Sequence, residues 1–406
     1  MLLQLAWRNI WRNPRRTILI LAAVTIAVWS MVFSSALMRG IADQMVRNGI
    51  ATLTGHIQIH QQGFRDDPSA AMHMKNPTEL KQTLQDHLPP GALFSARVRT
   101  NAVASNARHS GGVTLVGIDP DREKKLSFVS SSIISGNYLD AEDPYGIIIG
   151  TSLMNSLKTR VGNKLVVMAQ DTRQKMSSRA FRITGEYRAE LEATEKEFVF
   201  ITLPAAQNLL KMDEALSEIC IVLPDREKVR ETAAALARIL PKDHEILAWQ
   251  EMLPLVTATL RLYESIIYLW YLVAFTAMAF GLVNTFLMAV LERIREFGLL
   301  RALGMKSRWI IQGVMTESFF LLVIGIALGN ALGAISVIGL SHTGIDLSVF
   351  AGGTQYWGLP KIIYPVLLAS DAILVNGIVL VLGLLVSGYP ALKASHFTPV
   401  EAMAHT

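Results

Sequence analysis

The sequence predicts a membrane α-helical bundle of four transmembrane helices joined to one large α+β domain. Four apolar stretches each reach the roughly 20 residues that a helix needs to cross the hydrocarbon layer. Charged side chains gather instead between the first and second of these stretches. Only 17% of the 406 residues are charged, against about 25% in an ordinary soluble domain. We therefore expect a large part of the chain to lie within a lipid bilayer.

The predicted spans occupy residues 17–38, 265–291, 310–340 and 362–390. The first two contain no charged side chain, while the third contains Glu317 and the fourth contains Asp371. The first apolar run is longer than the 7–15 residues typical of a signal peptide, so we interpret it as a span and not as a cleaved leader.

Basic residues predict the orientation of the spans. Residues 1–16 contain four arginines and residues 292–309 contain five Lys or Arg, whereas residues 341–361 contain only Lys361. Short loops rich in Lys and Arg remain in the cytoplasm. We therefore expect both termini, with a tail at 391–406, to be cytoplasmic. The domain at 39–264 and the short loop at 341–361 then lie on the outer face.

The segment 39–264 alternates strand and helix signals. His56 to His60 alternates apolar and polar residues, which predicts a half-buried strand with a polar face. Asn76, Pro77 and Glu79 form a helix start with a cap and a proline at the first position. A last helix at 249–261 is predicted to run directly into the second span. Further strands are expected at 113–118, 147–149, 165–168, 181–186 and 198–201.

Motifs for catalysis or metal binding are not expected in this chain. His56 and His60 have no nearby Cys or carboxylate cluster to complete a metal site. The sequence contains no G-x-x-x-x-G-K-[ST], G-x-S-x-G or H-E-x-x-H pattern. We therefore predict no catalytic residues, no bound metal and no hydrolysis of ATP by the chain itself.

The segment from Glu292 to Arg308 mixes charged and apolar residues between two spans. On a helix, Phe297, Leu300 and Leu303 would share one face. Such a helix can rest on lipid headgroups, or it can dock in a groove of another protein.

This segment resembles the coupling helix of the FtsX-like and MacB-type permeases of ABC transporters. The family pattern ER-x-x-E-[IFV]-G-x-L-[RK]-A-x-G is matched here, and the amphipathic start at Ala6–Asn13 and the closing segments Tyr389–Ala394 and Pro399–Ala402 are also similar. The resemblance implies that an ATPase is contacted by residues of this pattern. They are Glu292, Arg293, Glu296, Phe297, Gly298, Leu300, Arg301 and Gly304.

The resemblance implies the type VII ABC transporter architecture in the bacterial inner membrane, with the large domain in the periplasm. Its partners would be a cytoplasmic ABC ATPase dimer that binds ATP and Mg, a second permease copy of the same or a diverged sequence, membrane lipid, and a periplasmic carrier or adaptor. No cofactor is expected in this chain, and no nucleic acid partner.

Within the family, Gly55–Ile59 and Phe198–Leu210 look most like the lipoprotein-releasing (Lol) permeases. This likeness implies extraction of lipoproteins from the membrane. The alternatives are export of peptides or antibiotics by a tripartite pump, and force transmission to a cell-wall hydrolase. The predicted hairpin tip at 170–178 is shorter than the hook with which Lol permeases recruit their carrier, which leaves carrier docking open.

Polar and small residues inside the spans have two interpretations. The stripe of Gly325, Gly329 and Gly333 permits close approach of another helix, within this chain or from a second copy. Glu317 lies near a span end, where an acid can reach interfacial water or pair with a nearby arginine, and such a structural role is favoured over an ion path. Asp371 and Asn376 point more weakly to a polar cavity.

Overall fold

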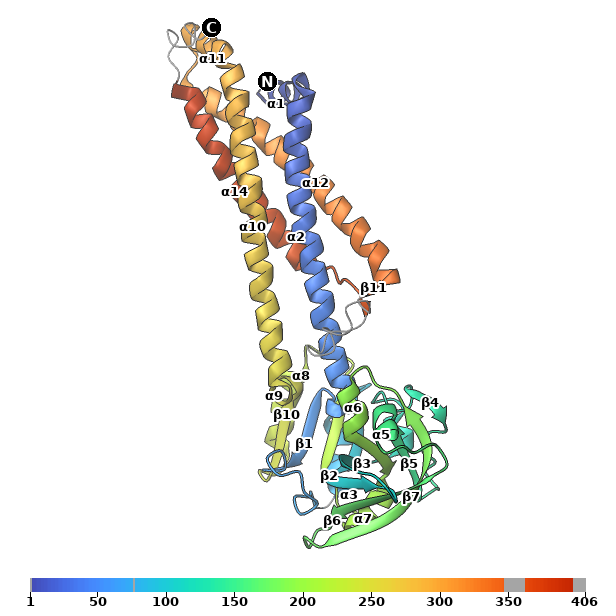
Figure 1. The fold of residues 1–406 in the computed structure, drawn as a ribbon. Coiled ribbons are helices and arrows are strands. Elements are labelled where there is room, and N and C mark those ends of the chain that lie inside the picture. The colour runs from blue at the N-terminus through green and yellow to red at the C-terminus, as the bar shows by residue number, and fades with distance from the viewer. Residues whose placement is uncertain (1, 76, 347–361, 397–406) are drawn as a thin grey trace. The chain divides into compact units, whose positions relative to one another are not determined.

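The computed structural model describes residues 2–75, 77–346 and 362–396. Their contacts divide them into a helical unit, residues 2–44, 259–346 and 362–396, and an α/β unit, residues 45–258. Two long helices, α2 (Pro14–Gly49) and α10 (Pro254–Glu292), contribute residues to both units (Figure 1).

The helical unit contains four helices that are long and apolar enough to span a membrane. They are α2, α10, α12 (Ser307–Thr343) and α14 (Ala369–His396). A helix satisfies its own backbone hydrogen bonds, which is why apolar runs take this form in lipid. Side chains from all four helices form one apolar core, and the prediction of four membrane helices is confirmed. Core members include Val28, Met31, Leu282, Leu322 and Val379.

The limits of the long helices differ from the sequence prediction in three places. Helix α2 continues past residue 38 to Gly49. A break at Leu253 (φ −115°, ψ 64°) separates the short α9 (Trp249–Met252) from α10, because a residue before proline is disfavoured in the helical region. The predicted helix at 249–261 therefore begins later, at Pro254, but from there it runs unbroken into the second span, as expected.

The fourth long helix begins at Ala369 and not at residue 362. Residues Ile362–Ile363 form the strand β12, which pairs with β11 (Ile345–Asp346). The extended chain then packs on α2, where the N–H of Val366 donates to the carbonyl of Ala36 at 2.9 Å. The predicted loop at 341–361 lies mostly outside the described residues, as do Asn76 and the closing segment Pro399–Ala402.

The α/β unit is built on a mixed ten-stranded sheet with the order β10-β1-β9-β2-β3-β8-β5-β7-β4, in which β6 pairs with β2 and β7. The pairs β3–β8 and β5–β7 are parallel and the other pairs are antiparallel. All five further predicted strands are present. The strands are β1 (Ile57–Gln61), β2 (Leu93–Ser105), β3 (Ser110–Ile118), β4 (Ile133–Gly136), β5 (Gly146–Gly150), β6 (Lys164–Gln170), β7 (Met176–Tyr187), β8 (Phe198–Thr202), β9 (Glu218–Val222) and β10 (His244–Ala248).

Both faces of this sheet are covered by apolar residues. On β5, Ile147 and Ile149 belong to one buried cluster and Ile148 belongs to another, as the alternation of side chains along a strand requires. Short helices lie over the sheet. They are α3 (Pro77–His87), α4 (Pro120–Glu123), α5 (Thr151–Ser156), α6 (Glu192–Glu197), α7 (Leu203–Leu210) and α8 (Val229–Ile239).

Strand β1 is buried on both faces, so the prediction of a solvated polar face is wrong. His56 and His60 are only 4% and 2% exposed. The buried polar groups instead find partners: His56 Nδ1 accepts the N–H of Leu223 at 2.8 Å, and Gln58 donates to the carbonyl of Leu53 at 3.1 Å. Because β1 pairs with strands on both sides, its location in the sheet overrides the amphipathic pattern.

A buried arginine, Arg97, holds the turn that connects α2 to the sheet. A π-helical turn (Ile50–Thr54) follows α2, and Leu53 there has φ +68°, a conformation unusual for a side chain with a Cβ. The carbonyl of Leu53 accepts a hydrogen bond from Arg97, whose guanidinium also contacts Glu123 at 2.6 Å and Glu218 at 3.3 Å. All three charged side chains are almost completely buried.

Candidate coupling site

The segment between α10 and α12 folds as a short helix, α11 (Ile294–Ala302). The non-helical Arg293 (φ −105°, ψ 12°) separates it from α10. Gly304 (φ +93°) ends it, because only glycine adopts that conformation without steric cost. The predicted amphipathic helix is thus present and has a turn at each end.

One face of α11 is directed inward. Phe297 and Gly298 are buried, and Leu300 is half-buried. Phe297 and Leu300 join an apolar cluster with side chains of α10, α12 and α14. Two of the three residues expected on a shared docking face, Phe297 and Leu300, therefore hold α11 in position.

The most exposed large apolar residues of this segment are Leu299 (63% exposed) and Leu303 (77% exposed). They are spaced i and i+4, so they lie on one side of the helix. Gly304 and Met305 follow them at the exposed end. Leu299 does not belong to the matched family pattern, and the signal that could have found it is this i, i+4 spacing.

The charged residues of the predicted site form a network with the first two helices. Arg16 contacts Glu292, and Arg12 contacts Glu296 at 2.8 Å. Arg293 bridges Glu296 at 3.0 Å and Glu317 at 3.2 Å. The structure therefore places Glu292, Arg293 and Glu296 together, and Glu317 pairs with an arginine, one of the two structural roles expected for it.

The network lowers one pKa and is extended by one further contact. Burial alone would raise the pKa of Glu296, but hydrogen bonds from Arg293 and Arg12 outweigh that effect and lower it. Arg301 donates to the carbonyl of Ser395 at 3.1 Å and so connects α11 to α14.

The glycine stripe of α12 faces α2 of the same chain. A Cβ placed at Gly325, Gly329 or Gly333 would lie 2.6, 2.6 or 2.9 Å from valines of α2, closer than side chains pack. The facing residues are Val24, Val28 and Val32. The stripe thus allows two spans of one chain to approach closely.

Polar residues within the bundle are paired across helices. Asp371 of α14 accepts two hydrogen bonds from Arg39 of α2, at 3.0 and 3.2 Å, and Asn376 accepts one from Asn330 at 2.8 Å. Such pairing is what low-dielectric surroundings require. It accounts for Asp371 and Asn376 without a polar cavity.

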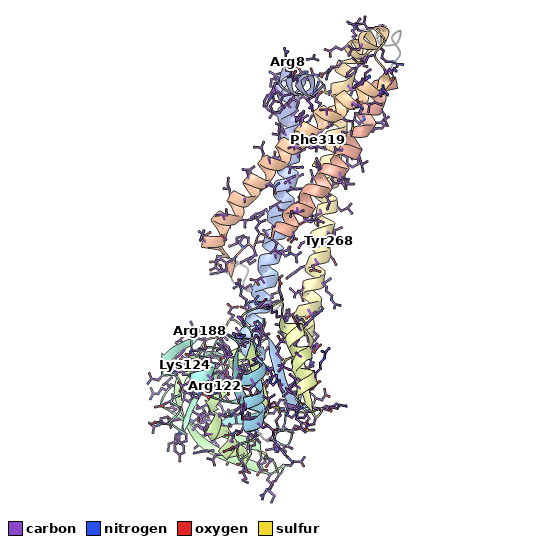
Figure 2. The ribbon with its side chains drawn as sticks, turned by 180° about the vertical axis from the view of Figure 1, so that it is seen from behind. Arg8, Arg122, Lys124, Arg188, Tyr268 and Phe319 are labelled. Atoms are coloured by element: carbon purple, nitrogen blue, oxygen red, sulfur yellow. The ribbon has the colours of Figure 1, made fainter. Side chains whose placement is uncertain are left out.

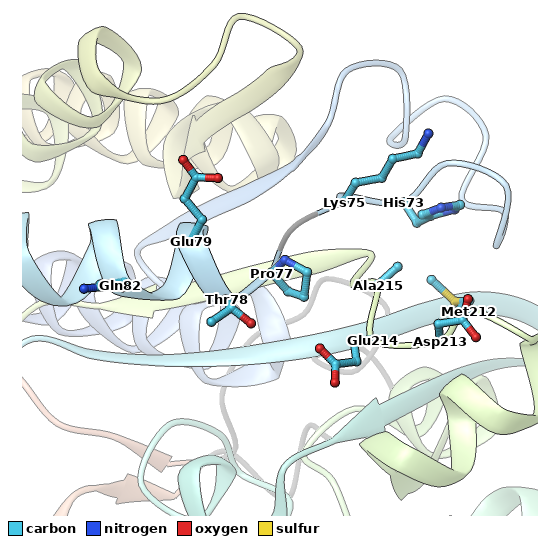
Figure 3. A pocket seen from close by; sticks show the side chains of 10 residues that line it. All are labelled: His73, Lys75, Pro77, Thr78, Glu79, Gln82, Met212, Asp213, Glu214 and Ala215. Atoms are coloured by element: carbon cyan, nitrogen blue, oxygen red, sulfur yellow. The ribbon is translucent and has the colours of Figure 1, made fainter.

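A cleft of ≈ 870 Å³ opens in the α/β unit between the start of α3 and the loop after α7 (Figure 3). Acidic Glu79, Asp213 and Glu214 share its lining with Lys75 and His73. This mixed charge differs from the apolar pocket that an acyl chain requires. In the parts of the chain that the structure describes, no group of three His, Cys, Asp or Glu could hold a metal ion.

The hairpin of β6 and β7 closes through a short turn, residues 171–175. Asp171 accepts the N–H groups of Arg173 and Lys175, each at 2.9 Å, and contacts Lys211 at 2.7 Å. These hydrogen bonds, that of Lys211 first, lower the pKa of Asp171 to about 2. The tip is thus tied to the unit by an aspartate that is charged at neutral pH.

The chain has four membrane helices, an α/β domain between the first two, and a short helix between the second and third, which together define an integral membrane protein. The MacB-like periplasmic core domain model matches residues 17–239, and the FtsX-like permease C-terminal model matches residues 268–399. The chain belongs to this FtsX-like and MacB-like family of ABC transporter permeases, and it is an inner-membrane permease.

The sequence relatives include a lipoprotein-releasing protein and a macrolide export protein. The lipoprotein-releasing system transmembrane protein LolC of Xylella fastidiosa is 20% identical over 398 residues, which cover 94% of this chain and 92% of LolC. The macrolide export ATP-binding/permease protein MacB of Escherichia coli is 23% identical over 99% of this chain but only 60% of MacB. The extracellular domain of the noncanonic ABC-type transporter YknZ from Gram-positive bacteria is 13% identical, with a TM-score of 0.34 over 47% of this chain and 98% of that domain.

Proposed function

We propose that this permease couples ATP hydrolysis by a separate cytoplasmic ABC ATPase to movement of its periplasmic domain, and that the movement extracts lipoproteins for delivery to the outer membrane. The observation that carries the cargo assignment is the alignment with LolC, which spans 94% of this chain and 92% of that relative. Two permease copies would assemble with an ATPase dimer, with both termini and α11 in the cytoplasm.

The arrangement of α11 supports the ATPase contact. Its inner face is fixed by Phe297 and Leu300, and the charge network fixes its start. A helix held in this way can transmit a push to α10 and α12. The apolar side chains most exposed for entry into an ATPase groove are Leu299 and Leu303.

The pairing of intramembrane polar groups supports an amphiphilic cargo. Asp371 and Asn376 have partners on neighbouring helices, whereas a water-filled path through the bundle would need polar lining. A cargo whose acyl chains remain in lipid needs no such path. Export in the manner of MacB is the second candidate, because that relative aligns with 99% of this chain.

Affinity purification of the full chain from its native membrane, with mass spectrometry of the retained proteins, tests the proposal. We expect a stoichiometric ABC ATPase together with triacylated lipoproteins. Retention of an ATPase with a periplasmic adaptor and no lipoproteins would favour export. An ATPase with a cell-wall hydrolase would favour the regulatory alternative, and the absence of any ATPase would overturn the coupling assignment.

Replacement of both exposed leucines, Leu299→Ser with Leu303→Ser, is expected to reduce ATPase retention at least about a hundredfold. Each leucine buried at an interface contributes roughly 1.5–3 kcal/mol, and 1.4 kcal/mol corresponds to a factor of ten. Because both side chains are largely exposed in the chain itself, its fold should persist. Retained ATPase is measured by quantitative pull-down.

Met176→Ser is the matched control, because Met176 is 64% exposed in the α/β unit. It should leave ATPase retention unchanged. Equal losses in both variants would show a general effect on membrane extraction, and unchanged retention in the leucine variant would exclude these side chains as the contact.

A further inference from the structure

Helix α1 (Leu2–Arg12) exposes an aromatic stripe. Leu3, Trp7 and Trp11 are 63%, 44% and 56% exposed and repeat every four residues. Ala6 and Ile10 on another face are buried, and Trp7 also contacts the ring of Phe320 on α12, with centroids 5.7 Å apart. The helix thus packs on the bundle by one side and leaves a row of two tryptophans uncovered.

A basic row lies beside this stripe. Arg8, which Figure 2 shows on α1, and Arg12 follow each other at i and i+4, and Arg15 and Arg16 begin α2. Residues 1–16 contain no Asp or Glu. Arg12 and Arg16 are paired with Glu296 and Glu292. Within the described residues, Arg8 and Arg15 have no carboxylate partner and are exposed.

Tryptophan beside exposed arginine is the composition of a helix in the headgroup layer of a membrane. Tryptophan prefers the boundary between lipid and water, and arginine is attracted to the phosphates of anionic lipids. We propose that α1 binds anionic lipid headgroups through Arg8 and Arg15, with Trp7 and Trp11 among the acyl carbonyls. The bound α1 then holds α11 in place through two ion pairs, Arg12–Glu296 and Arg16–Glu292.

The proposal has two consequences that nonspecific attraction of anionic lipid to exposed basic residues would not have. The binding site is confined to α1 and the start of α2, although Lys306 and Arg308 are also exposed basic residues of the same unit. Lipid bound at α1 also reduces the mobility of α11, because the ion pairs join the two segments. This second consequence can be measured in the permease alone, without any ATPase.

The first test is native mass spectrometry of the purified full chain in detergent, titrated with phosphatidylglycerol and, separately, with phosphatidylcholine. We expect preferential binding of phosphatidylglycerol. Arg8→Ser with Arg15→Ser should weaken it by roughly tenfold to thirtyfold, since each arginine near an anionic surface contributes about a fivefold step. Trp7→Ser with Trp11→Ser should weaken binding of both lipids.

The matched control is Lys306→Ser with Arg308→Ser, which should leave the preference unchanged. Equal losses in both pairs of variants would overturn the assignment to α1. Competition by millimolar inorganic phosphate would also overturn it, because a free-phosphate site needs no lipid.

The second test is hydrogen–deuterium exchange of α11 amides in nanodiscs. In the unmodified chain, an equimolar mixture of phosphatidylglycerol and phosphatidylcholine should slow exchange relative to pure phosphatidylcholine. Arg12→Ser with Arg16→Ser should abolish that difference while phosphatidylglycerol still binds. An unchanged lipid effect on α11 in this variant would overturn the role of the two ion pairs.

Discussion

Gly329→Leu is expected to separate α2 from α12 and to lower the free energy of unfolding by at least about 3 kcal/mol, the upper part of the range for overpacked cores. A Cβ at this position would lie 2.6 Å from Cβ of Val28 and 2.9 Å from the backbone oxygen of Thr25. A rotamer change cannot relieve a clash with backbone, so one helix must move. Denaturant unfolding of the full chain in detergent micelles measures the loss.

Gly339→Leu makes the same change on the same helix where a Cβ would meet nothing within 4 Å. This control should change the free energy of unfolding by less than about 0.5 kcal/mol, as surface substitutions do. If both variants lose the same free energy of unfolding, leucine destabilises α12 at either position, and the close contact at Gly329 does not explain the loss.

The glycine stripe illustrates what a sequence can predict about a membrane bundle. A repeat of small residues every four positions indicates that one helix face approaches a neighbour. It does not identify that neighbour, because the valines of α2 that fill the approach are ordinary apolar residues about 300 positions away. Hydropathy likewise predicted the four spans, but not that Ile362–Ile363 is held extended by pairing with β11.

In the candidate site as well, the sequence pattern identified the residues but not the side chains that they contact. The family pattern identified the residues around α11, and the helix is present. Which of them face outward depends on packing against α14, where Arg301 meets the carbonyl of Ser395. Periodicity alone placed Phe297 and Leu300 beside Leu303, yet only Leu303 is largely exposed.

Nothing in the sequence around Arg97 marks it as a buried charge. Strand β2 alternates polar and apolar residues, so Arg97 and Arg99 are equivalent by pattern. Their environments differ, because Arg97 faces the turn after α2 and both Glu123 and Glu218, and its side chain is 0% exposed against 29% for Arg99. The buried cluster arises from three segments that are distant in sequence.

Arg97→Met is expected to destabilise the α/β unit by about 3–5 kcal/mol, the usual cost of leaving a buried charge without its partner. The change removes the contacts to Glu123 and Glu218 and the hydrogen bond that holds Leu53 at φ +68°. Hydrogen–deuterium exchange of the full chain should show the loss first in β2, β9 and the turn after α2.

Two comparisons separate the lost charge balance from lost packing. Arg99→Met, on the same strand but partly exposed, should cost less than about 1 kcal/mol. Adding Glu123→Gln and Glu218→Gln to Arg97→Met should recover part of the stability, because the buried carboxylates are then neutral. A triple variant no more stable than the single one would show that packing and not charge is decisive.

The stability of the unmodified chain and that of the Arg97→Met variant should depend on pH in opposite directions. Burial alone would raise the pKa of Glu123, but Arg97 outweighs it and lowers that pKa below the usual 4.5. In the unmodified chain Glu123 therefore adds stability above pH 4.5 that is lost as the pH falls through its lowered pKa. Without Arg97, burial is the largest remaining influence and raises the pKa of Glu123, so acid favours the folded variant. The stability difference between the two proteins should thus shrink as the pH falls from 7 toward 4.5, and a constant difference would contradict the buried ion cluster as its cause.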